Sequence, residues 1–336
     1  MRPLILDVQG VELDAQEKEI LGHPLVAGVI LFTRNFANIK QLKELVQQIR
    51  FYAQKEILIA VDHEGGRVQR FKEEFTLLPA AGALLKFSEM AEAKQLAFSS
   101  AWVMASELIA CDIDLSFAPV LDLNGISDVI QERAFSSSVD ATIELAQAYI
   151  SGMKAAGMRS TGKHFPGHGS VKADSHIDLP VDDRTKIEIF NKDILPFSQL
   201  IKCGQLDAVM PSHVVYQQCD NLPAGFSAYW LQTVLRQQLQ FKGIIISDDL
   251  SMHGASFAGN HVSRAENALK AGCDLILACN DSIGAISILD NLRAPMADDS
   301  VISKLRYSKN RVVLPLHKNP IWVENNQKLR QFAERI

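Results

Sequence analysis

The sequence predicts an α/β fold, a single-domain (β/α)8 barrel of the TIM type. Eight short apolar segments alternate with longer amphipathic segments along the 336-residue chain. Segments such as residues 243–247 (GIIIS) are almost continuously apolar, which is typical of strands in a parallel sheet covered on both faces. No linker rich in Pro, Ser or charge divides the chain. We therefore expect residues 1–336 to form one barrel domain with a helical C-terminal tail from about residue 300.

The expected elements follow one another in strand–helix alternation. We expect strands at residues 4–8, 28–32, 57–61, 114–120, 158–163, 207–211, 243–247 and 274–278. The helical patterns lie at residues 38–54, 90–110, 140–156, 186–202, 227–240 and 262–271. A doubly wound open sheet is the alternative, but no G-x-G-x-x-G motif follows an early strand. The tail is rich in Lys and Arg and ends in a polar segment, 324–335, expected to be a solvated outer helix.

Composition excludes several classes of protein. The chain is 47% hydrophobic with a net charge of -5, so it lacks the global basic field of a nucleic-acid-binding protein. It has no run of eighteen apolar residues, and its N-terminus reaches Asp7 too soon for a signal peptide, so we expect no membrane association. The five cysteines are odd in number and lack C-x-x-C spacing, as expected for reduced thiols. We expect a cytoplasmic monomer.

Polar residues follow five strands in succession. In a barrel of this type, functional side chains collect where the strands end. The strand-end residues are Asp62, His63, Glu64, Arg67 and Arg70 after the third strand, Asp122, Asn124 and Arg133 after the fourth, Lys163 and His164 after the fifth, Ser212 and His213 after the sixth, and Asp248 and Asp249 after the seventh. Asp and Asn are also common in turns and helix caps, so one such end would mean little. Five in succession predict one polar mouth that holds an active site.

Residues 160–180 (STGKHFPGHGSVKADSHIDLP) concentrate ionisable side chains among glycines and prolines that forbid a regular helix. His164, His168 and His176 could be read as a zinc site, but Pro166 and Gly167 interrupt the spacing and no H-E-x-x-H motif occurs. The alternative is that Asp174 supports His176, because a carboxylate near an imidazole favours its charged form and fixes its tautomer. His176 is then a candidate general acid and base.

Asp248 and Asp249 follow the apolar segment 243–247 directly. Successive side chains of a strand point to opposite sides, so residue identity alone does not say which carboxylate faces a ligand. One of the two could instead cap a following helix. A serine triad fits less well, because the chain contains no G-x-S-x-G motif.

Three motifs resemble glycoside hydrolase family 3. Residues 163–169 (KHFPGHG), followed by 174–176 (DSH), are similar to the signature loop of its bacterial β-N-acetylglucosaminidase branch. Residues 243–254 (GIIISDDLSMHG) resemble the family's nucleophile signature, and 62–70 (DHEGGRVQR) its sugar-binding loop. The likeness runs in order from about residue 4 to about residue 290, as one barrel without the second domain of many family members.

The resemblance implies a retaining hydrolase that removes terminal β-linked N-acetylglucosamine. In the recycling branch of the family, the substrate is N-acetylglucosaminyl-1,6-anhydromuramyl material, with or without its peptide, in the bacterial cytoplasm. Asp248 would then be the nucleophile, and His176 the general acid/base with Asp174 as its partner. The sugar-binding residues that the resemblance implies are Asp62, Arg70, Arg133, Lys163 and His164. It implies a sugar or muropeptide as the small-molecule partner and neither a metal nor an organic cofactor.

Three alternatives differ in chemistry. A glycoside phosphorylase on the same scaffold would use phosphate in place of water, since a histidine acid/base does not repel that anion as a carboxylate would. A non-catalytic sugar-binding protein would keep Asp62 and Arg70 without needing both Asp248 and His176. A metal-dependent barrel hydrolase would lose its activity in EDTA. The loop salt bridge also remains an alternative role for Arg133.

Overall fold

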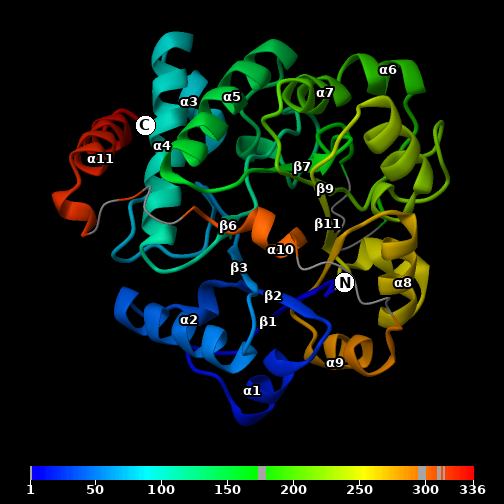
Figure 1. Ribbon diagram of the computed structural model, residues 1–336. Helices are drawn as coiled ribbons and strands as arrows, with labels where there is room; N and C mark the ends of the chain where they lie inside the picture. The colour runs from blue at the N-terminus through cyan, green and yellow to red at the C-terminus, as the bar shows by residue number, and fades with distance from the viewer. Residues whose placement is uncertain (1, 173–178, 294–299, 309–311, 313–314) are drawn as a thin grey trace.

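Eight parallel strands form the centre of the molecule, and helices surround them (Figure 1). The computed structural model describes residues 2–172, 179–293, 300–308, 312 and 315–336. The strands are β1 (Leu4–Asp7), β2 (Val26–Leu31), β3 (Leu58–Val61), β6 (Leu115–Ser116), β7 (Thr161–Phe165), β9 (Ala208–Pro211), β11 (Ile244–Asp249) and β12 (Leu275–Ala278). All eight expected strands are present, and their order in the sheet is β6-β3-β2-β1-β12-β11-β9-β7. The predicted (β/α)8 barrel is confirmed.

The segment after β6 closes the ring between β6 and β7. The amide of Thr161 donates to the carbonyl of Ala118 at 2.7 Å, and the amide of Leu121 donates to the carbonyl of Lys163 at 2.6 Å. A parallel bridge between Val120 and Lys163 lies between these two bonds. Because the ring is closed, the carboxyl ends of all eight strands surround one opening.

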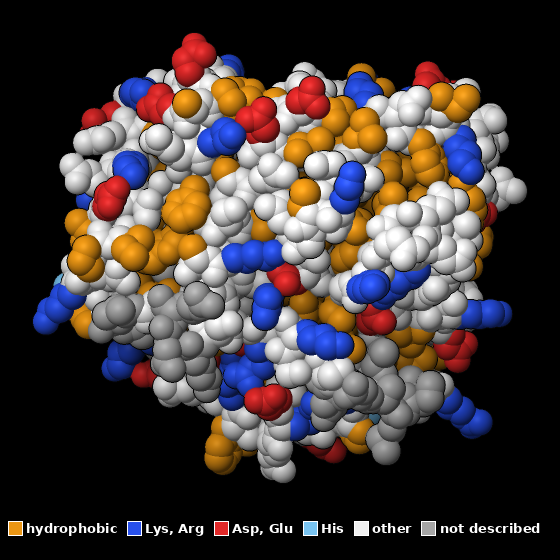
Figure 2. Space-filling model, turned by 45° about the horizontal axis from the view of Figure 1, so that its top comes forward, with side chains coloured by type: hydrophobic (Ala, Val, Ile, Leu, Met, Phe, Trp, Pro, Cys, Tyr) orange, Lys and Arg blue, Asp and Glu red, His pale blue; other side chains and the backbone are white. Residues whose placement is uncertain are grey.

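The barrel has an apolar interior and an apolar layer between strands and helices. Side chains such as Ile5, Phe117, Met210 and Ile246 fill the interior and are buried. A larger cluster that includes Leu42, Trp102, Tyr149 and Trp230 packs the helices against the outside of the ring; the strands are thus apolar on both faces. Charged side chains of both signs are interspersed with apolar ones on the face shown in Figure 2.

The crossover segments supply the surrounding helices. They are α1 (Ala15–Gly22), α2 (Ile39–Ala53), α3 (Ala81–Lys86), α4 (Met90–Ile109), α5 (Val139–Ala156), α6 (Lys186–Asn191), α7 (Ile194–Lys202), η4 (Tyr229–Gln238), α8 (His261–Ala271) and α9 (Ser282–Asn291). Short 3-10 turns lie at η1 (Thr33–Asn35), η2 (Gln131–Arg133), η3 (Ala224–Phe226), η5 (His253–Ala258) and η6 (Leu316–Lys318). Two further strand pairs are β4 (His63–Gly65) with β5 (Val68–Gln69) and β8 (Val181–Asp182) with β10 (Val215–Tyr216).

The helices depart from expectation in two places. The continuous helix expected at 186–202 is wrong, because the chain leaves the helical conformation at Lys192 and divides into α6 and α7. The buried carboxylate of Asp193 accounts for the break, since it pairs with Arg184 at 2.8 Å outside both helices. The sequence pattern also missed α1, whose start is a capping box between Asp14 and Glu17, and α9.

The C-terminal tail belongs to the barrel. Helix α10 (Ser300–Leu305) lies across the amino-terminal end of the ring, at the centre of Figure 1, and buries Ile302 and Leu305 in the interior cluster. Helix α11 (Pro320–Ala333) packs beside α4 and buries Leu329 and Phe332. The expected outer helix at 324–335 is present as α11, with most of its residues exposed, and its buried residues cover α4. Helix α10, whose place in the core was not expected, closes the floor of the barrel. Among the described helices, none is both long and apolar enough to cross a membrane.

Replacing Leu305 by Ala should lower the free energy of unfolding by about 2–5 kcal/mol, because it leaves a cavity under the barrel. Leu77 is 65% exposed, and Leu77→Ala should change the unfolding free energy by less than about 0.5 kcal/mol. Urea unfolding of both variants measures the difference. Equal effects would show that α10 is not part of the barrel core.

Candidate active site

A cavity of about 330 Å³ opens at the carboxyl ends of the strands. Its lining combines side chains that follow β2, β3, β6, β7, β11 and β12 with the tips of the interior layer, among them Met210 and Leu277. The predicted polar mouth is thus a single pocket. Its volume is at the small end of the range for ligand sites, as suits one sugar ring rather than a chain.

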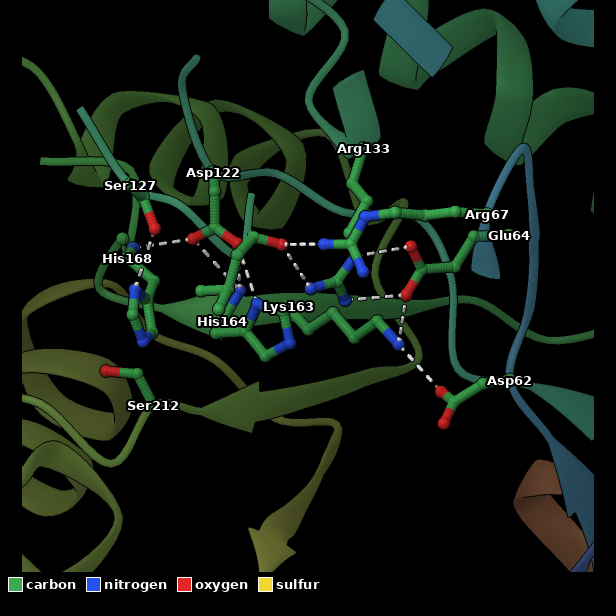
Figure 3. Close-up of polar contacts among 12 residues, drawn as sticks. Asp62, Glu64, Arg67, Asp122, Ser127, Arg133, Lys163, His164, His168 and Ser212 are labelled. Atoms are coloured by element: carbon green, nitrogen blue, oxygen red, sulfur yellow. Dashed lines mark hydrogen bonds and ion pairs between the residues drawn. The ribbon is translucent and has the colours of Figure 1, made fainter. Parts of the chain in front are cut away.

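Lys163 is the most deeply buried cation of this pocket, with a side chain only 3% exposed. Its ammonium lies 2.8 Å from Asp62 Oδ1 and 2.7 Å from Glu64 Oε1, as Figure 3 shows. Burial alone would lower the pKa of Lys163, but the two carboxylates hold it above its usual range. Asp62 is partly buried, which opposes its ionisation, yet Lys163 and Arg70 hold its pKa below the usual value. Lys163 and Asp62 therefore stay charged at neutral pH.

Arg133 reaches the same cluster from η2, in the loop after β6. Its Nε donates to Glu64 Oε2 and its Nη2 to Glu64 Oε1, both at 2.8 Å, which is the strong bidentate geometry. Its Nη1 donates to the carbonyl of Val129 at 3.1 Å, and Arg67 donates to the same carbonyl. The loop salt bridge is therefore present, and Arg133 also lines the cavity.

Arg70 and His164 complete the set of predicted sugar-binding residues. Arg70 Nη2 lies 3.3 Å from Asp62 Oδ2, and its guanidinium stands 5.6 Å from the ring centre of Phe32. His164 Nδ1 lies 2.7 Å from Asp122 Oδ2. Asp62, Arg70, Arg133, Lys163 and His164 all line the cavity, so the structure brings together the five residues that the sequence suggested.

Asp122 fixes the base of the loop that follows β7. Its buried carboxylate also accepts the amide of His168 at 2.7 Å. Burial would raise the pKa of Asp122, but His164 and His168 hold it below the usual value. A Cβ on Gly169 would lie 1.7 Å from the carbonyl of Leu123, so only glycine fits there. His168 lines the cavity, and its Nε2 has no partner among the described residues.

Asp174 and His176 lie outside the described residues. The predicted pairing of these two side chains therefore stays a prediction from the sequence. Within the described part of the chain, no three His, Cys, Asp or Glu side chains are grouped so that they could hold a metal ion.

The two carboxylates at the end of β11 have different surroundings. Asp249 Oδ1 accepts the amides of Ser251 and Cys279, each at 3.0 Å, and its Oδ2 accepts the Ser251 hydroxyl at 2.7 Å. Asp248 and Asp249 both line the cavity, and Asp248 Oδ1 accepts the amide of Asp249 at 2.8 Å. The carboxylate of Asp249 is thus occupied by protein donors on both oxygens.

No role was predicted for Glu64, although it joins Lys163 to Arg133. The available signal was its place in the run of charged residues from Asp62 to Arg70. Phe32, Cys279 and Asn280 also line the cavity and were not predicted. They follow β2 and β12, two strands whose ends carry no cluster of charge.

Comparisons with known proteins agree with this geometry. The family model described as the glycosyl hydrolase family 3 N-terminal domain matches residues 5–306. A β-hexosaminidase of Psychromonas ingrahamii is 70% identical over 337 residues and covers 100% of both chains. One of Haemophilus influenzae is 50% identical over 343 residues, covering 100% of this chain and 97% of the relative.

Solved structures give the same result. The native crystal structure of NagZ from Neisseria gonorrhoeae superposes with a TM-score of 0.91 at 40% identity, covering 98% of this chain and 97% of that chain. Its complex with N-trifluoroacetyl-D-glucosamine gives a TM-score of 0.92 at 40% identity and covers 98% of each chain. The chain therefore belongs to glycosyl hydrolase family 3, and it is a glycoside hydrolase of the β-hexosaminidase kind.

Proposed function

We propose that this enzyme is a retaining exo-β-N-acetylglucosaminidase that works through a covalent glycosyl-Asp248 intermediate. The observation that carries the proposal is the position of Asp248. It lines the cavity at the end of β11, and β11 and β3 are separated by three strands in either direction around the ring. A sugar in this cavity thus has a carboxylate on one side and, on the other, Asp62 with Lys163 and Arg70, the two cations that it contacts.

This arrangement orients the sugar. If its anomeric carbon C1 lies at Asp248, then C4, the ring carbon farthest from C1, faces Asp62 on the opposite side. Asp62, Arg70, Arg133, Lys163 and His164 supply charge-assisted hydrogen bonds to the hydroxyls at that end. The C4 end of the sugar then lies against these ion-paired side chains, which leave no room for a further sugar there. This supports removal of terminal residues only.

The chemistry proceeds in two balanced steps. A carboxylate oxygen of Asp248 attacks C1 and forms a glycosyl ester, while the bond from C1 to the leaving oxygen breaks and that oxygen takes a proton from the imidazolium of His176. Water then gives a proton to the neutral imidazole and attacks C1, which releases Asp248 as carboxylate and the sugar with its original configuration. Asp174 supports the imidazolium. These two roles rest on the sequence motif.

The names of similar proteins support the substrate class. The relatives in Psychromonas and Haemophilus are β-hexosaminidases, and the Neisseria NagZ structure holds an N-acylated glucosamine. We extend the proposal to N-acetylglucosaminyl-1,6-anhydromuramyl fragments, with or without peptide, in cytoplasmic peptidoglycan recycling. Residues 1–336 would act as one catalytic domain and as a monomer.

Replacing Asp248 by Asn should lower kcat/KM by about 10⁴-fold or more, because the amide cannot form the glycosyl ester. Asp249→Asn is the matched control and should retain most activity, since an Asn can still accept the amides of Ser251 and Cys279. Hydrolysis of 4-nitrophenyl N-acetyl-β-D-glucosaminide measures both variants.

The same assay separates the alternatives. Wild-type turnover unaffected by EDTA supports a metal-free hydrolase, and sugar 1-phosphate formed on adding phosphate would indicate a phosphorylase. A larger loss for Asp249→Asn than for Asp248→Asn would move the nucleophile to Asp249. Absence of wild-type turnover would refute the proposed substrate class.

The pKa of Asp249 should also affect how the free energy of unfolding depends on pH. Burial raises its pKa from 3.8 to about 6 in the folded state, despite the lowering effect of its donors. Between these values the folded state binds more protons than the unfolded state, so this carboxyl makes the protein less stable as pH rises. The Asn variant does not titrate there. Between pH 4 and pH 7 the wild type should therefore lose stability relative to the Asn variant. The unfolding free energy of the variant minus that of wild type should rise over this range by at most about 3 kcal/mol. A difference independent of pH would contradict the raised pKa.

His176→Ala should harm substrates with poor leaving groups most. For a sugar leaving group, kcat/KM should fall by about 10²–10⁴-fold, because the departing oxygen needs a proton. An activated dinitrophenyl leaving group needs little protonation, so its release should fall far less. Asp174→Asn should resemble a partial loss of His176. Equal losses of kcat/KM on both substrates would rule out the acid role.

A further inference from the structure

Glu64 lies in β4, directly behind the wall of the cavity. Its side chain is 8% exposed, and protein partners engage both of its oxygens. Oε1 lies 2.7 Å from Lys163 Nζ and accepts Arg133 Nη2 at 2.8 Å, while Oε2 accepts Arg133 Nε at 2.8 Å. One carboxylate thus joins β4, the loop after β6 and strand β7.

Glu64 differs from Asp62 in what it can reach. Asp62 lines the cavity, with a side chain 20% exposed, whereas Glu64 is not among the described residues that line it. Both partners of Glu64, Lys163 and Arg133, do line the cavity. Any effect of Glu64 on a bound ligand therefore passes through these two cations.

The two cations need this carboxylate in order to stand side by side. Lys163 is buried and Arg133 largely so, and like charges at short range repel strongly where water is excluded. Arg133 and Lys163 hold the pKa of Glu64 well below its usual range although burial opposes this, so Glu64 stays ionised. Arg133 is also tied to the Val129 carbonyl, which leaves its guanidinium few other orientations.

We propose that Glu64 is a positioning residue, which holds Lys163 and Arg133 against the non-reducing end of the bound sugar. The inference rests on the proposed function, because the position of Asp248 decides which end of the sugar faces these cations. Glu64 would then govern recognition of the hydroxyl on C4 and leave the bond-breaking at C1 to other residues.

The test compares two substrates in two proteins. The substrates are 4-nitrophenyl N-acetyl-β-D-glucosaminide and its 4-deoxy analogue, and the proteins are wild type and Glu64→Gln. In wild type, removing the hydroxyl should lower kcat/KM by about 100-fold, since buried polar groups lose their partner. Glu64→Gln should lose about 100-fold on the parent substrate, but removing the hydroxyl should then cost less than about 10-fold.

Glu107→Gln is the control for loss of a buried carboxylate. Glu107 is 7% exposed and accepts hydrogen bonds from Thr76 and Trp322, away from the cavity. Its substitution should leave the roughly 100-fold effect of the 4-hydroxyl intact, whatever it does to stability. A purely structural role of Glu64 would give the same pattern as Glu107→Gln.

Each outcome decides between the proposals. If wild type is active and Glu64→Gln keeps the full effect of the 4-hydroxyl, the positioning role alone is overturned. An inactive wild type overturns the proposed function and this inference with it. Should Glu64→Gln fail to fold, Glu64→Gln/Arg133→Gln removes the unpaired guanidinium. The positioning role requires the 4-hydroxyl to count for less in this double variant than in Arg133→Gln, because Lys163 also loses a carboxylate partner; an equal effect of the 4-hydroxyl in the two variants contradicts it.

Discussion

Burial of opposite charges at the mouth of the barrel is the constraint on which this active site depends. An isolated ammonium or carboxylate taken out of water costs several kcal/mol, so Lys163 could not be buried alone. Asp62 and Glu64 make its burial possible, and Arg133 balances the second carboxylate. Because these groups come from distant parts of the chain, their mutual dependence fixes the loops that carry them. The polar wall is therefore set by the same interactions that hold the loops together.

Three aspartates at this end of the barrel have different roles because their carboxylates have different neighbours. The carboxylate of Asp122 contacts the imidazole of His164 and accepts the amide of His168, so it holds the loop after β7. Asp249 is satisfied by backbone amides and a hydroxyl, which ties β11 to the residues after β12. Asp248 and Asp249 both line the cavity. We propose Asp248 as the nucleophile because both oxygens of Asp249 accept hydrogen bonds from the protein.

Sequence patterns predicted the strands well, because most of them lie in an almost unbroken apolar run buried on both faces; β7, with the sequence TGKHF, is an exception. They failed where a tertiary contact decides the outcome. The pairing of Asp193 with Arg184 divides an apparently continuous helix, and the burial of Leu305 depends on a barrel that no local pattern reveals. In the active site, strand ends and motifs located the five sugar-binding candidates. The role of Glu64 depends on partners about 70 and 100 positions away in the chain. The choice between Asp248 and Asp249 depends on the amide of Cys279, which donates to Asp249.

Because helix α10 follows the last strand in the chain, the core of the barrel is completed late in synthesis. The apolar interior is lined by seven of the eight strands, with none of its residues from β7, and its floor is covered by Ile302 and Leu305, which come after the last strand. During synthesis, a chain that has completed β12 still exposes the lower end of its core to water. The final packing of the barrel must wait until about nine-tenths of the protein has been made. The family model, which ends at residue 306, takes in this helix and excludes α11.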